Sequence, residues 1–365
     1  MGNMKVLIVD DSAFMRKMIN DFLHGYKGIE VAGTARNGRD AIEKIEKLNP
    51  DVITMDVEMP VMNGIDAVKE IMTFSPRPVI MLSSTTQAGA EATFLALEAG
   101  AVDFVAKPSG AISLDLHKIR DELREKVLSA KHAKINMPLV PEKNQKPHLL
   151  KTKYSKISSV KENIPIEYNR IRQETAPLIC MGTSTGGPRA LQRVLPSLPA
   201  DLGGPVFIVQ HMPKGFTASL AERLNRISMI QVKEACSGEK AEAGTAYIAP
   251  GGSHLTVLQK GKDLFIKVDQ EPARNGHRPS VDVLFESISI LEGFSNIAVI
   301  MTGMGSDGTK GLCLLKEKGN TNAIAESEHT SIVYGMPRSA IAADLIDAVE
   351  DADNIAERIL HYIQS

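Results

Sequence analysis

The stretch Gly182-Thr-Ser-Thr-Gly-Gly-Pro188 separates a short apolar run from a helical pattern. The apolar run, Pro177–Met181, is unbroken and bounded by punctuating residues, which is typical of a buried strand. Apolar residues at helical spacing follow Pro188, and proline is common in the first turn of a helix. The stretch therefore predicts a strand, a glycine-rich turn and a helix, with Ser184 where the turn meets the helix.

Ser184 is the residue of this turn that can carry chemistry. Free backbone N–H groups and the positive end of the helix dipole collect at such a junction, which suits an oxyanion or a phosphate. The pattern Gly182-x-Ser184-x-Gly186 fits a nucleophile elbow, in which a serine is held exposed on a tight strand-to-helix turn. A dinucleotide-binding fingerprint does not fit, because Ser184 stands in place of its second glycine. A tight turn without chemistry is the third interpretation.

Length and composition limit the class of protein. The 365 residues allow two domains of ordinary size, and a hydrophobic fraction of 43% suffices for their cores. A formal net charge of −2 gives no reason to expect nucleic acid or an anionic membrane as a partner. The three cysteines lack metal-ligand spacing, and neither a membrane span nor a secretory signal is evident. We therefore expect a cytoplasmic protein with reduced thiols and no insertion into membranes.

Residues 1–130 alternate five times between short apolar runs and helical patterns. This rhythm predicts a flavodoxin-like (βα)5 domain, with a parallel sheet and helices on both of its faces. Ligands in such folds bind beyond the carboxyl ends of the strands. The expected strands are Lys5–Asp10, Val31–Ala35, Asp51–Asp56, Val79–Ser83 and Val102–Val105.

Polar residues gather at these strand ends. Asp10 and Asp11 come at the end of the first strand and Asp56 ends the third. Ser83 ends the fourth strand, and Lys107 follows the fifth. Three adjacent carboxylates need a compensating cation, and their oxygens suit Mg²⁺. Each acid alone is better explained as a surface residue or a helix cap, but the five residues together favour a site where a carboxylate becomes an aspartyl phosphate.

Residues 1–130 resemble a response-regulator receiver domain. In that family, the aspartate that matches Asp56 accepts phosphate from a histidine kinase. The aspartates that match Asp10 and Asp11, and the backbone carbonyl that matches Glu58, hold Mg²⁺ with it. The stretches that carry the resemblance are Val9-Asp-Asp-Ser12, Met55-Asp-Val-Glu-Met-Pro60, Asn63-Gly64, Ser83-Ser84 and Lys107-Pro108.

The resemblance also implies roles for three further residues of this domain. Ser83 and Lys107 would contact the phosphoryl oxygens, and Phe104 matches the family's aromatic switch position. Packing in the core explains Phe104 equally well. The resemblance thus implies an N-terminal domain that is controlled by phosphorylation.

Residues 131–175 lack this regular alternation. They contain many lysines, few acids and several prolines, a composition typical of a flexible tether. A basic docking strip for an acidic partner is the alternative interpretation. The segment separates residues 1–130 from residues 176–365, so we expect the two domains to move relative to each other.

Residues 176–365 again predict an α/β domain, doubly wound and mostly parallel. Helical patterns follow several of its strands, but a hairpin between Gly251 and Val268 interrupts the alternation, with a turn at Gly261-Lys262. The expected strands are Leu178–Met181, Val206–Gln210, Ile230–Glu234, Ala246–Ala249, His254–Val257, Leu264–Val268, Ile297–Met301 and Ala323–Ala325.

A serine nucleophile needs a base, and the base needs an acid that orients it. His211 and Asp307 each follow an expected strand of this domain, which puts both at the sheet edge where Ser184 lies. Taken singly, His211 can be a loop histidine and Asp307 a helix cap. His254 and His277 are alternative bases, but the first lies inside a strand pattern and the second in a loop. The order serine, histidine, aspartate differs from that of α/β-hydrolases.

Residues 176–345 resemble the catalytic domain of the chemotaxis protein-glutamate methylesterases, the CheB family. One departure is that Glu326-Ser327 stands where the family usually has Gln-Asp. The stretches that carry the resemblance are Gly182-Thr-Ser-Thr-Gly-Gly187, Gln210-His-Met-Pro213, Tyr247-Ile-Ala-Pro-Gly-Gly252, Pro279-Ser-Val-Asp-Val-Leu-Phe285, Thr302–Gly308 and Gly335-Met-Pro-Arg338.

This resemblance implies phosphorylation-regulated hydrolysis of glutamate γ-methyl esters on the cytoplasmic helices of chemoreceptors, with no cofactor for the esterase reaction. Ser184 would attack the ester, His211 would accept its proton, and Asp307 would orient the imidazole. Backbone N–H groups near the turn, together with Met304, would bind the oxyanion. Some members of the family also deamidate receptor glutamines. The sequence leaves open whether this chain does so.

A non-enzymatic alternative is a response regulator whose second domain only binds a partner or a nucleotide. A DNA-binding output is disfavoured, because the sequence has no helix-turn-helix pattern and no basic recognition helix. Its isoelectric point of about 6.5 points the same way. Covalent labelling of Ser184 by a serine-directed probe distinguishes the esterase from the binding module.

Overall fold

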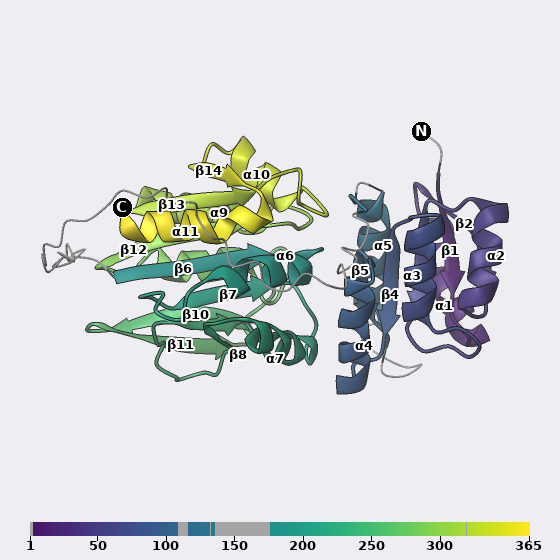
Figure 1. The fold of residues 1–365 in the computed structure, drawn as a ribbon, viewed down its shortest axis with the longest axis horizontal. Coiled ribbons are helices and arrows are strands. Elements are labelled where there is room, and N and C mark those ends of the chain that lie inside the picture. The colour runs from purple at the N-terminus through teal and green to yellow at the C-terminus, as the bar shows by residue number, and fades with distance from the viewer. Residues whose placement is uncertain (1–2, 109–115, 132, 136–175, 319) are drawn as a thin grey trace, which may run out of the picture.

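The computed structural model describes residues 3–108, 116–131, 133–135, 176–318 and 320–365. They form two α/β units that lie side by side (Figure 1). We call residues 3–131 the N-terminal unit and residues 176–365 the C-terminal unit. Most of the segment expected to be a tether, residues 136–175, lies outside the described residues.

The N-terminal unit is a five-stranded parallel sheet with helices on both faces, as the sequence predicts. Each strand lies within two residues of its expected place. In sheet order the strands are β2 (Ile29–Ala35), β1 (Met4–Val9), β3 (Val52–Asp56), β4 (Val79–Ser83) and β5 (Asp103–Ala106). The helices are α1 (Ala13–Leu23), α2 (Gly38–Leu48), α3 (Gly64–Phe74), α4 (Gln87–Glu98) and α5 (Leu116–Ala130).

Polar side chains fix where the first four helices begin. Ser12 Oγ accepts from the N–H of Met15 at the start of α1, and Asn63 Oδ1 accepts from the N–H of Asp66 at the start of α3. Asn37 and Thr86 cap α2 and α4 in the same way. Such caps satisfy helix N–H groups that otherwise have no partner. Because α1 and α3 begin just after the acidic ends of β1 and β3, their caps also fix the loops that carry those acids.

The C-terminal unit has a seven-stranded sheet in which every neighbouring pair is parallel. In sheet order its strands are β14 (Ala348–Glu350), β13 (Thr321–Glu326), β12 (Phe294–Ile300), β6 (Ala176–Thr183), β7 (Val206–Gln210), β9 (Thr245–Ile248) and β8 (Gln231–Glu234). The helices are α6 (Gly187–Val194), α7 (Phe216–Ile227), α8 (Val281–Ile288), α9 (Thr309–Glu317), α10 (Met336–Ala342) and α11 (Ile355–Gln364). Leu195–Ser197 and Ala352–Asn354 form short 3-10 helices. β14 and α11 were not predicted from the sequence.

Both faces of this sheet are buried, which confirms the doubly wound architecture. Alternate residues of β6 belong to different cores: Ile179 packs with α6, α7 and α11, while Leu178 packs with α8, α9 and α10. The expected hairpin is confirmed as β10 (His254–Lys260) and β11 (Asp263–Asp269), which pair antiparallel in a separate sheet. Lys260 pairs with Asp263, so Gly261 and Lys262 form its turn.

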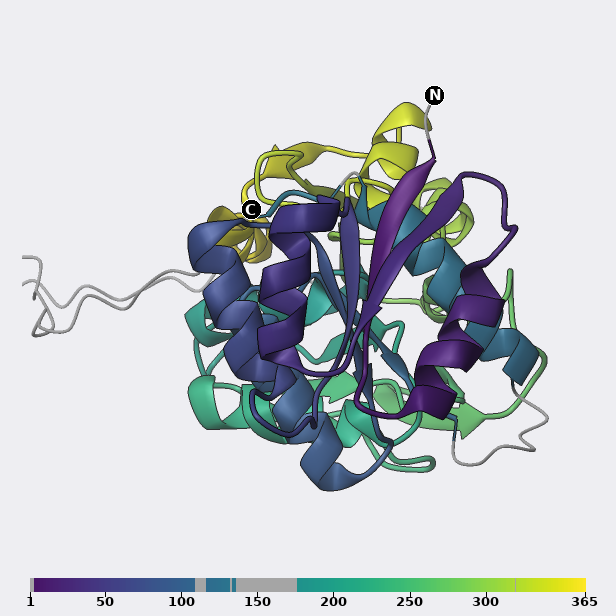
Figure 2. The ribbon, with the colours of Figure 1, turned by 90° about the vertical axis from the view of Figure 1, so that its right-hand side faces the viewer.

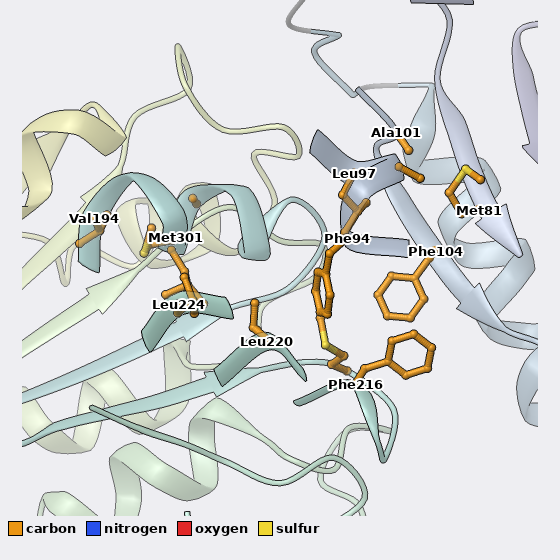
Figure 3. Packing of buried hydrophobic residues seen from close by; sticks show 14 of the residues in the cluster. Met81, Phe94, Leu97, Ala101, Phe104, Val194, Phe216, Leu220, Leu224 and Met301 are labelled. Carbon is orange, nitrogen blue, oxygen red and sulfur yellow. The ribbon is translucent and has the colours of Figure 1, made fainter. Parts of the chain in front are cut away.

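The two units contact each other through α4 and β5 on one side and α6 and α7 on the other (Figure 1). Figure 2 views the molecule from its end, with the N-terminal unit in front of the C-terminal unit. One cluster of buried apolar side chains continues across the boundary. The Phe104 ring from β5 lies 4.5 Å, centroid to centroid, from the Phe216 ring at the start of α7, and Phe94 packs beside them (Figure 3). Among the described residues, no helix is both long enough and apolar enough to cross a lipid bilayer.

Candidate functional site

The predicted strand, turn and helix around Ser184 are confirmed as β6, residues 184–186 and α6. Gly186 has a φ of +83°, in the left-handed region that favours glycine. A Cβ on Gly187 would lie 1.9 Å from Gln210 Oε1, so only glycine fits there. Ser184 itself is half-buried, and its N–H donates to Thr302 O at 3.0 Å. The turn therefore holds the serine at the carboxyl end of β6 within reach of solvent.

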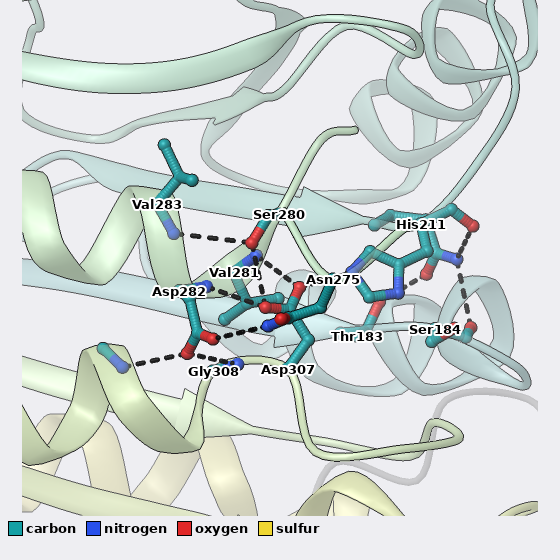
Figure 4. Close-up of polar contacts among 12 residues, drawn as sticks. Thr183, Ser184, His211, Asn275, Ser280, Val281, Asp282, Val283, Asp307 and Gly308 are labelled. Atoms are coloured by element: carbon teal, nitrogen blue, oxygen red, sulfur yellow. Dashed lines mark hydrogen bonds and ion pairs between the residues drawn. The ribbon is translucent and has the colours of Figure 1, made fainter. Parts of the chain in front are cut away.

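His211 and Asp307 meet beside this turn (Figure 4). The N–H of His211 donates to Thr183 O at 3.1 Å, which ties the end of β7 to the end of β6. On the histidine ring, Nε2 lies 2.7 Å from Asp307 Oδ2. The other ring nitrogen, Nδ1, is buried and has no hydrogen-bond partner among the described residues. It is therefore the nitrogen free to act as a base.

Neighbouring donors hold Asp307 in its ionised form. Its Oδ1 accepts from Ser280 Oγ at 2.9 Å and from the N–H of Asp282 at 3.1 Å, and its Oδ2 accepts from the N–H of Val281 at 2.7 Å. Although burial opposes ionisation, the hydrogen bonds from His211 and from these backbone groups hold the pKa of Asp307 well below its usual range. A fixed carboxylate of this kind orients an imidazole and stabilises its cation.

Ser184 and His211 are the expected nucleophile and the expected base. No hydrogen bond joins Ser184 to His211 within the part of the chain that the structure describes. Such contacts are often loose before a substrate is bound, so this does not exclude the pair. The order of strands in the sequence predicted that all three residues lie at one sheet edge. The structure adds the direct contact between His211 and Asp307.

Several residues that support the site were not predicted from the sequence. Gln210 Nε2 donates to the carbonyls of Ser184 and His211, each at 3.0 Å. Asp282 Oδ1 accepts from the N–H groups of Gly308 and Gly311, each at 2.9 Å, and so fixes the start of α9. Burial raises the pKa of Asp282, and the nearby charge of Asp307 adds to this. Gln210 and Asp282 both lie inside motifs that the sequence singled out, but their side-chain contacts depend on the fold.

The two alternative bases take different positions. His254 is buried at the start of β10, and its Nε2 lies 3.2 Å from Pro272 O. His277 lies directly against His211, with the two rings stacked 4.0 Å apart. Met304, expected at the oxyanion site, packs against a small apolar cluster that contains Val102 of the N-terminal unit. The N-terminal unit therefore lies close to the candidate active site.

The acidic cluster at the edge of the N-terminal sheet forms as predicted. One carboxylate oxygen from each of Asp10, Asp11 and Asp56 lies within 4.8 Å of the others. Lys107 Nζ lies 2.7 Å from Asp56 Oδ2 and 3.0 Å from Asp10 Oδ2. Burial raises the pKa of Asp56 to about 6, although Lys107 opposes the rise. Clustered carboxylates with a single lysine fit a hard divalent cation such as Mg²⁺.

The structure places Ser83 and Glu58 near this cluster by their backbones. The N–H of Glu58 lies 3.4 Å from Asp56 Oδ1, and the N–H of Lys107 donates to Ser83 O at 2.7 Å. The Ser83 hydroxyl, however, bonds to Gly89 O at 3.0 Å and to Thr93 Oγ1 at 2.6 Å rather than to the acids. Its expected contact with phosphoryl oxygens stays a prediction, because it requires the hydroxyl to turn.

Comparison with known proteins matches both units. The family described as CheB methylesterase matches residues 179–359, and the family described as response regulator receiver domain matches residues 6–117. A protein-glutamate methylesterase/protein-glutamine glutaminase of Geobacillus kaustophilus (strain HTA426) is 53% identical over 363 residues, covering 100% of this chain and 99% of the relative. The protein of the same name from Bacillus subtilis (strain 168) is 51% identical, covering 97% of each chain.

A solved structure matches the C-terminal unit. The crystal structure of the Thermotoga maritima CheB methylesterase catalytic domain is 41% identical, with a TM-score of 0.50. The match covers 51% of this chain and 98% of that one.

Proposed function

This chain belongs to the CheB methylesterase family, and on that premise we propose that it hydrolyses glutamate γ-methyl esters on chemoreceptors, releasing methanol. The observation that carries the proposal is the His211–Asp307 contact of 2.7 Å beside the half-buried Ser184. Together these residues supply a nucleophile, a base and an orienting acid for acyl transfer. The substrate glutamates lie on the cytoplasmic helices of receptors, so we propose that the protein acts in the cytoplasm.

The reaction would follow from the arrangement of these three residues. Ser184 Oγ attacks the γ-carbonyl carbon, and His211 Nδ1 accepts the hydroxyl proton. Asp307, held as a carboxylate, stabilises the resulting imidazolium. When the tetrahedral intermediate collapses, the bond to the methoxy group breaks and His211 returns its proton to form methanol. A water molecule, deprotonated by His211, then cleaves the acyl-serine and releases glutamate.

Backbone donors of the turn would stabilise the oxyanion. The N–H of Ser184 already donates to Thr302 O. Those of Thr185 and Gly186 take part in no backbone hydrogen bond that the described part of the chain shows. We therefore assign the oxyanion to these two N–H groups. Donors of this kind contribute about 2.7–4 kcal/mol each to transition-state stabilisation.

The same site would also hydrolyse receptor glutamines. The relatives' names include protein-glutamine glutaminase. Attack of Ser184 on a γ-amide is the same acyl transfer, with ammonia in place of methanol as the leaving group. Because His211 protonates the leaving group in both cases, no further residue is needed.

Phosphorylation of the N-terminal unit would control the esterase. We assign Asp56 as the phosphate acceptor from a histidine kinase. Asp10, Asp11, Asp56 and the carbonyl of Glu58 would hold Mg²⁺, which when bound neutralises charge on the transferred phosphoryl group. Lys107 would contact the phosphoryl oxygens after it leaves the acids. A binding module without catalysis is not favoured, because such a module has no need for the His211–Asp307 pair beside a serine turn.

Methanol release from methylated receptor membranes tests the proposal. The intact protein should release methanol, and a small phosphodonor with Mg²⁺ should increase the rate. Ser184→Ala should abolish release and labelling by a serine-directed probe. Normal turnover by the folded Ser184→Ala protein would refute the mechanism, and absence of release by the phosphorylated intact protein would refute the function.

A further inference from the structure

The catalytic histidine candidate has a second histidine lying flat on its ring. The rings of His211 and His277 are 4.0 Å apart between centroids, with only 7° between their planes. The His211 side chain is 9% exposed, and His277 is half-buried. The Asp307 contact and the stack therefore restrain different parts of the imidazole. The carboxylate holds one edge at Nε2, and His277 covers one face.

The sequence builds a rigid support for His277. It ends the tight turn Arg274-Asn275-Gly276-His277, in which Arg274 and His277 exchange backbone hydrogen bonds of 3.0 and 2.9 Å. The central residues have φ values of +52° and +85°, and Asn-Gly is the pair best suited to two left-handed positions in succession. Arg274 also pairs with Glu286 of α8 at 2.8 Å. The turn is thus fixed to the body of the unit.

A fixed ring face matters because one hydrogen bond does not define an imidazole's orientation. With only the Nε2 contact, the His211 ring can swing about that edge and move Nδ1 away from Ser184. A flat ring 4.0 Å away blocks the swing. The position of Nδ1 matters, since a displacement of about 1 Å of a catalytic group lowers reaction rates by about 10²-fold. The stacked face also stabilises the imidazolium that forms when His211 accepts the serine proton.

We propose that His277 is a positioning residue for the esterase reaction, which holds the plane of His211 and supports its cationic form without transferring a proton itself. This inference rests on the proposed function of Ser184, His211 and Asp307.

The charges around His277 agree with this role. Burial lowers the pKa of His277 to about 4, the charges of His211 and Lys126 act in the same direction, and Asp307 opposes them. Near neutral pH the ring is therefore uncharged, and it does not repel an imidazolium beside it. A base would need a pKa closer to the working pH.

Two substitutions separate the ring face from the ring nitrogens. His277→Ala removes both, while His277→Phe keeps a flat aromatic face that carries no proton. In the intact protein with phosphodonor and Mg²⁺, His277→Ala should lower kcat for methanol release about 10- to 100-fold with little change in KM. His277→Phe should recover most of that loss and keep the wild-type pH profile. His361→Ala, at an exposed position on α11, is the control.

A titration by NMR tests the stack independently of turnover. In the Ser184→Ala protein, the ring of His277 should titrate near pH 4, and the pKa should rise when His211→Asn removes the neighbouring ring. If the pKa of His277 is near 6.5 and does not change in the His211→Asn variant, the two rings do not stack in solution. Full activity of His277→Ala, or equal loss in His277→Ala and His277→Phe, would overturn the positioning role. Turnover by Ser184→Ala would instead contradict the proposed function. It would not affect the evidence that the titration gives on the stacking of the two rings.

Discussion

Asp307, which we propose orients the catalytic histidine, shows how strongly a single residue can depend on its neighbours. Its carboxylate contacts His211 and also accepts from one hydroxyl and two backbone N–H groups. A buried donor that loses its acceptor costs about 1–3 kcal/mol. Replacement by alanine therefore affects stability as well as catalysis, whereas asparagine keeps an oxygen in place.

Asp307→Asn and Asp307→Ala should both lose at least about 10³-fold in kcat, because neither orients the imidazole with a negative charge. Both should also lower the midpoint of thermal unfolding, Asp307→Ala by more, because each oxygen of Asp307 accepts from a backbone N–H and asparagine keeps only one of the two oxygens. Calorimetry and methanol release, measured on the same preparations, check both parts. An active Asp307→Asn enzyme would show that the charge of Asp307 is not needed.

Ser184→Ala and His211→Ala should each lower kcat by about 10³-fold or more. Ser184→Ala should leave unfolding unchanged, since Ser184 is half-buried and its turn is held by backbone contacts. His211→Ala should also lower the unfolding midpoint, because buried Asp307 loses a partner. Residues that act as a unit are not additive, so the double variant should be no slower than either single one. Initial rates of methanol release give the comparison. Additive losses in the double variant would mean that the two residues act independently.

Asp56→Asn should block incorporation of phosphate from a small phosphodonor, because Asp56 is a buried acid that contacts Lys107 and lies beside Asp10 and Asp11. Removal of Mg²⁺ with a chelator should do the same to the wild-type protein. Acid-labile label counted on the intact protein measures both effects. The exposed acid Asp66 offers a control, since Asp66→Asn should label normally. Label on Asp56→Asn would assign the acceptor to another residue.

At the scale of elements, the sequence predicts what depends on local pattern. The unbroken apolar runs and their punctuation place β6, its turn and α6, and the same rhythm places the acids at the ends of β1 and β3. The strand β14 was missed because its three residues lie at a sheet edge and carry no pattern of their own. The helix α11 was also missed, although Ile355, Ala356 and Ile359 form a buried face at helical spacing. Its signal was therefore present in the sequence.

Side-chain contacts between distant elements lie beyond such patterns. The stack of His277 on His211 joins a tight turn to the end of β7, and no spacing in the sequence relates the two. For Ser83, the sequence predicts the position of the residue but not the contacts of its side chain. Its position at the end of β4 was predicted, but its hydroxyl bonds to Gly89 and Thr93, which only the packing of α4 determines.

Glu326, at the end of β13, stands where the resemblance implied glutamine. It is 1% exposed and accepts from the N–H of Thr302 at 2.8 Å and from Thr330 Oγ1 at 2.9 Å. Burial raises its pKa, while these hydrogen bonds and the charge of Arg193 oppose the rise and Asp351 adds to it. Folding therefore favours the protonated acid. The stabilisation is complete below the ordinary pKa of 4.5 and declines as the pH rises through the higher value of the folded state.

Glu326→Gln should remove this decline. Between about pH 4 and about pH 8, its unfolding midpoint should rise relative to that of the wild type, because the amide cannot ionise. Scanning calorimetry across this range measures the difference, and Glu328→Gln, an exposed neighbour, is the matched control. Loss of one hydrogen bond to Thr330 gives only a constant offset. A difference that does not change with pH would mean that Glu326 is ionised equally in both states.

At the scale of the whole molecule, the N-terminal unit lies against the elements that carry the candidate active site. Thr185, the residue after Ser184, donates to Asp103 of β5, and the ring of Phe104 packs against that of Phe216. The contact between these units also includes the ion pair of Glu98 and Arg223. We expect this arrangement to restrict substrate access, and phosphorylation at Asp56 to weaken it. The added charge of about −1.5 to −2 lies at the same sheet edge as β5's end.

The Glu98–Arg223 pair allows this coverage to be tested in the intact protein, because both side chains are partly exposed and lie outside the catalytic residues. Glu98→Arg and Arg223→Glu should each put like charges across the boundary and weaken docking by about 1 kcal/mol. A free-energy change of about 1.4 kcal/mol alters an equilibrium tenfold, so a loss of about 1 kcal/mol in docking should raise the hydrolysis rate of the unphosphorylated protein about fivefold. The double variant restores opposite charges and should return to the wild-type rate.

With phosphodonor, all four proteins should hydrolyse methyl esters equally fast, since the units are then already apart, and label on Asp56 should be equal throughout. If neither single variant exceeds the wild type without phosphodonor, the N-terminal unit does not inhibit by covering the site. If the double variant stays as fast as the singles, the pair is not what holds the units together.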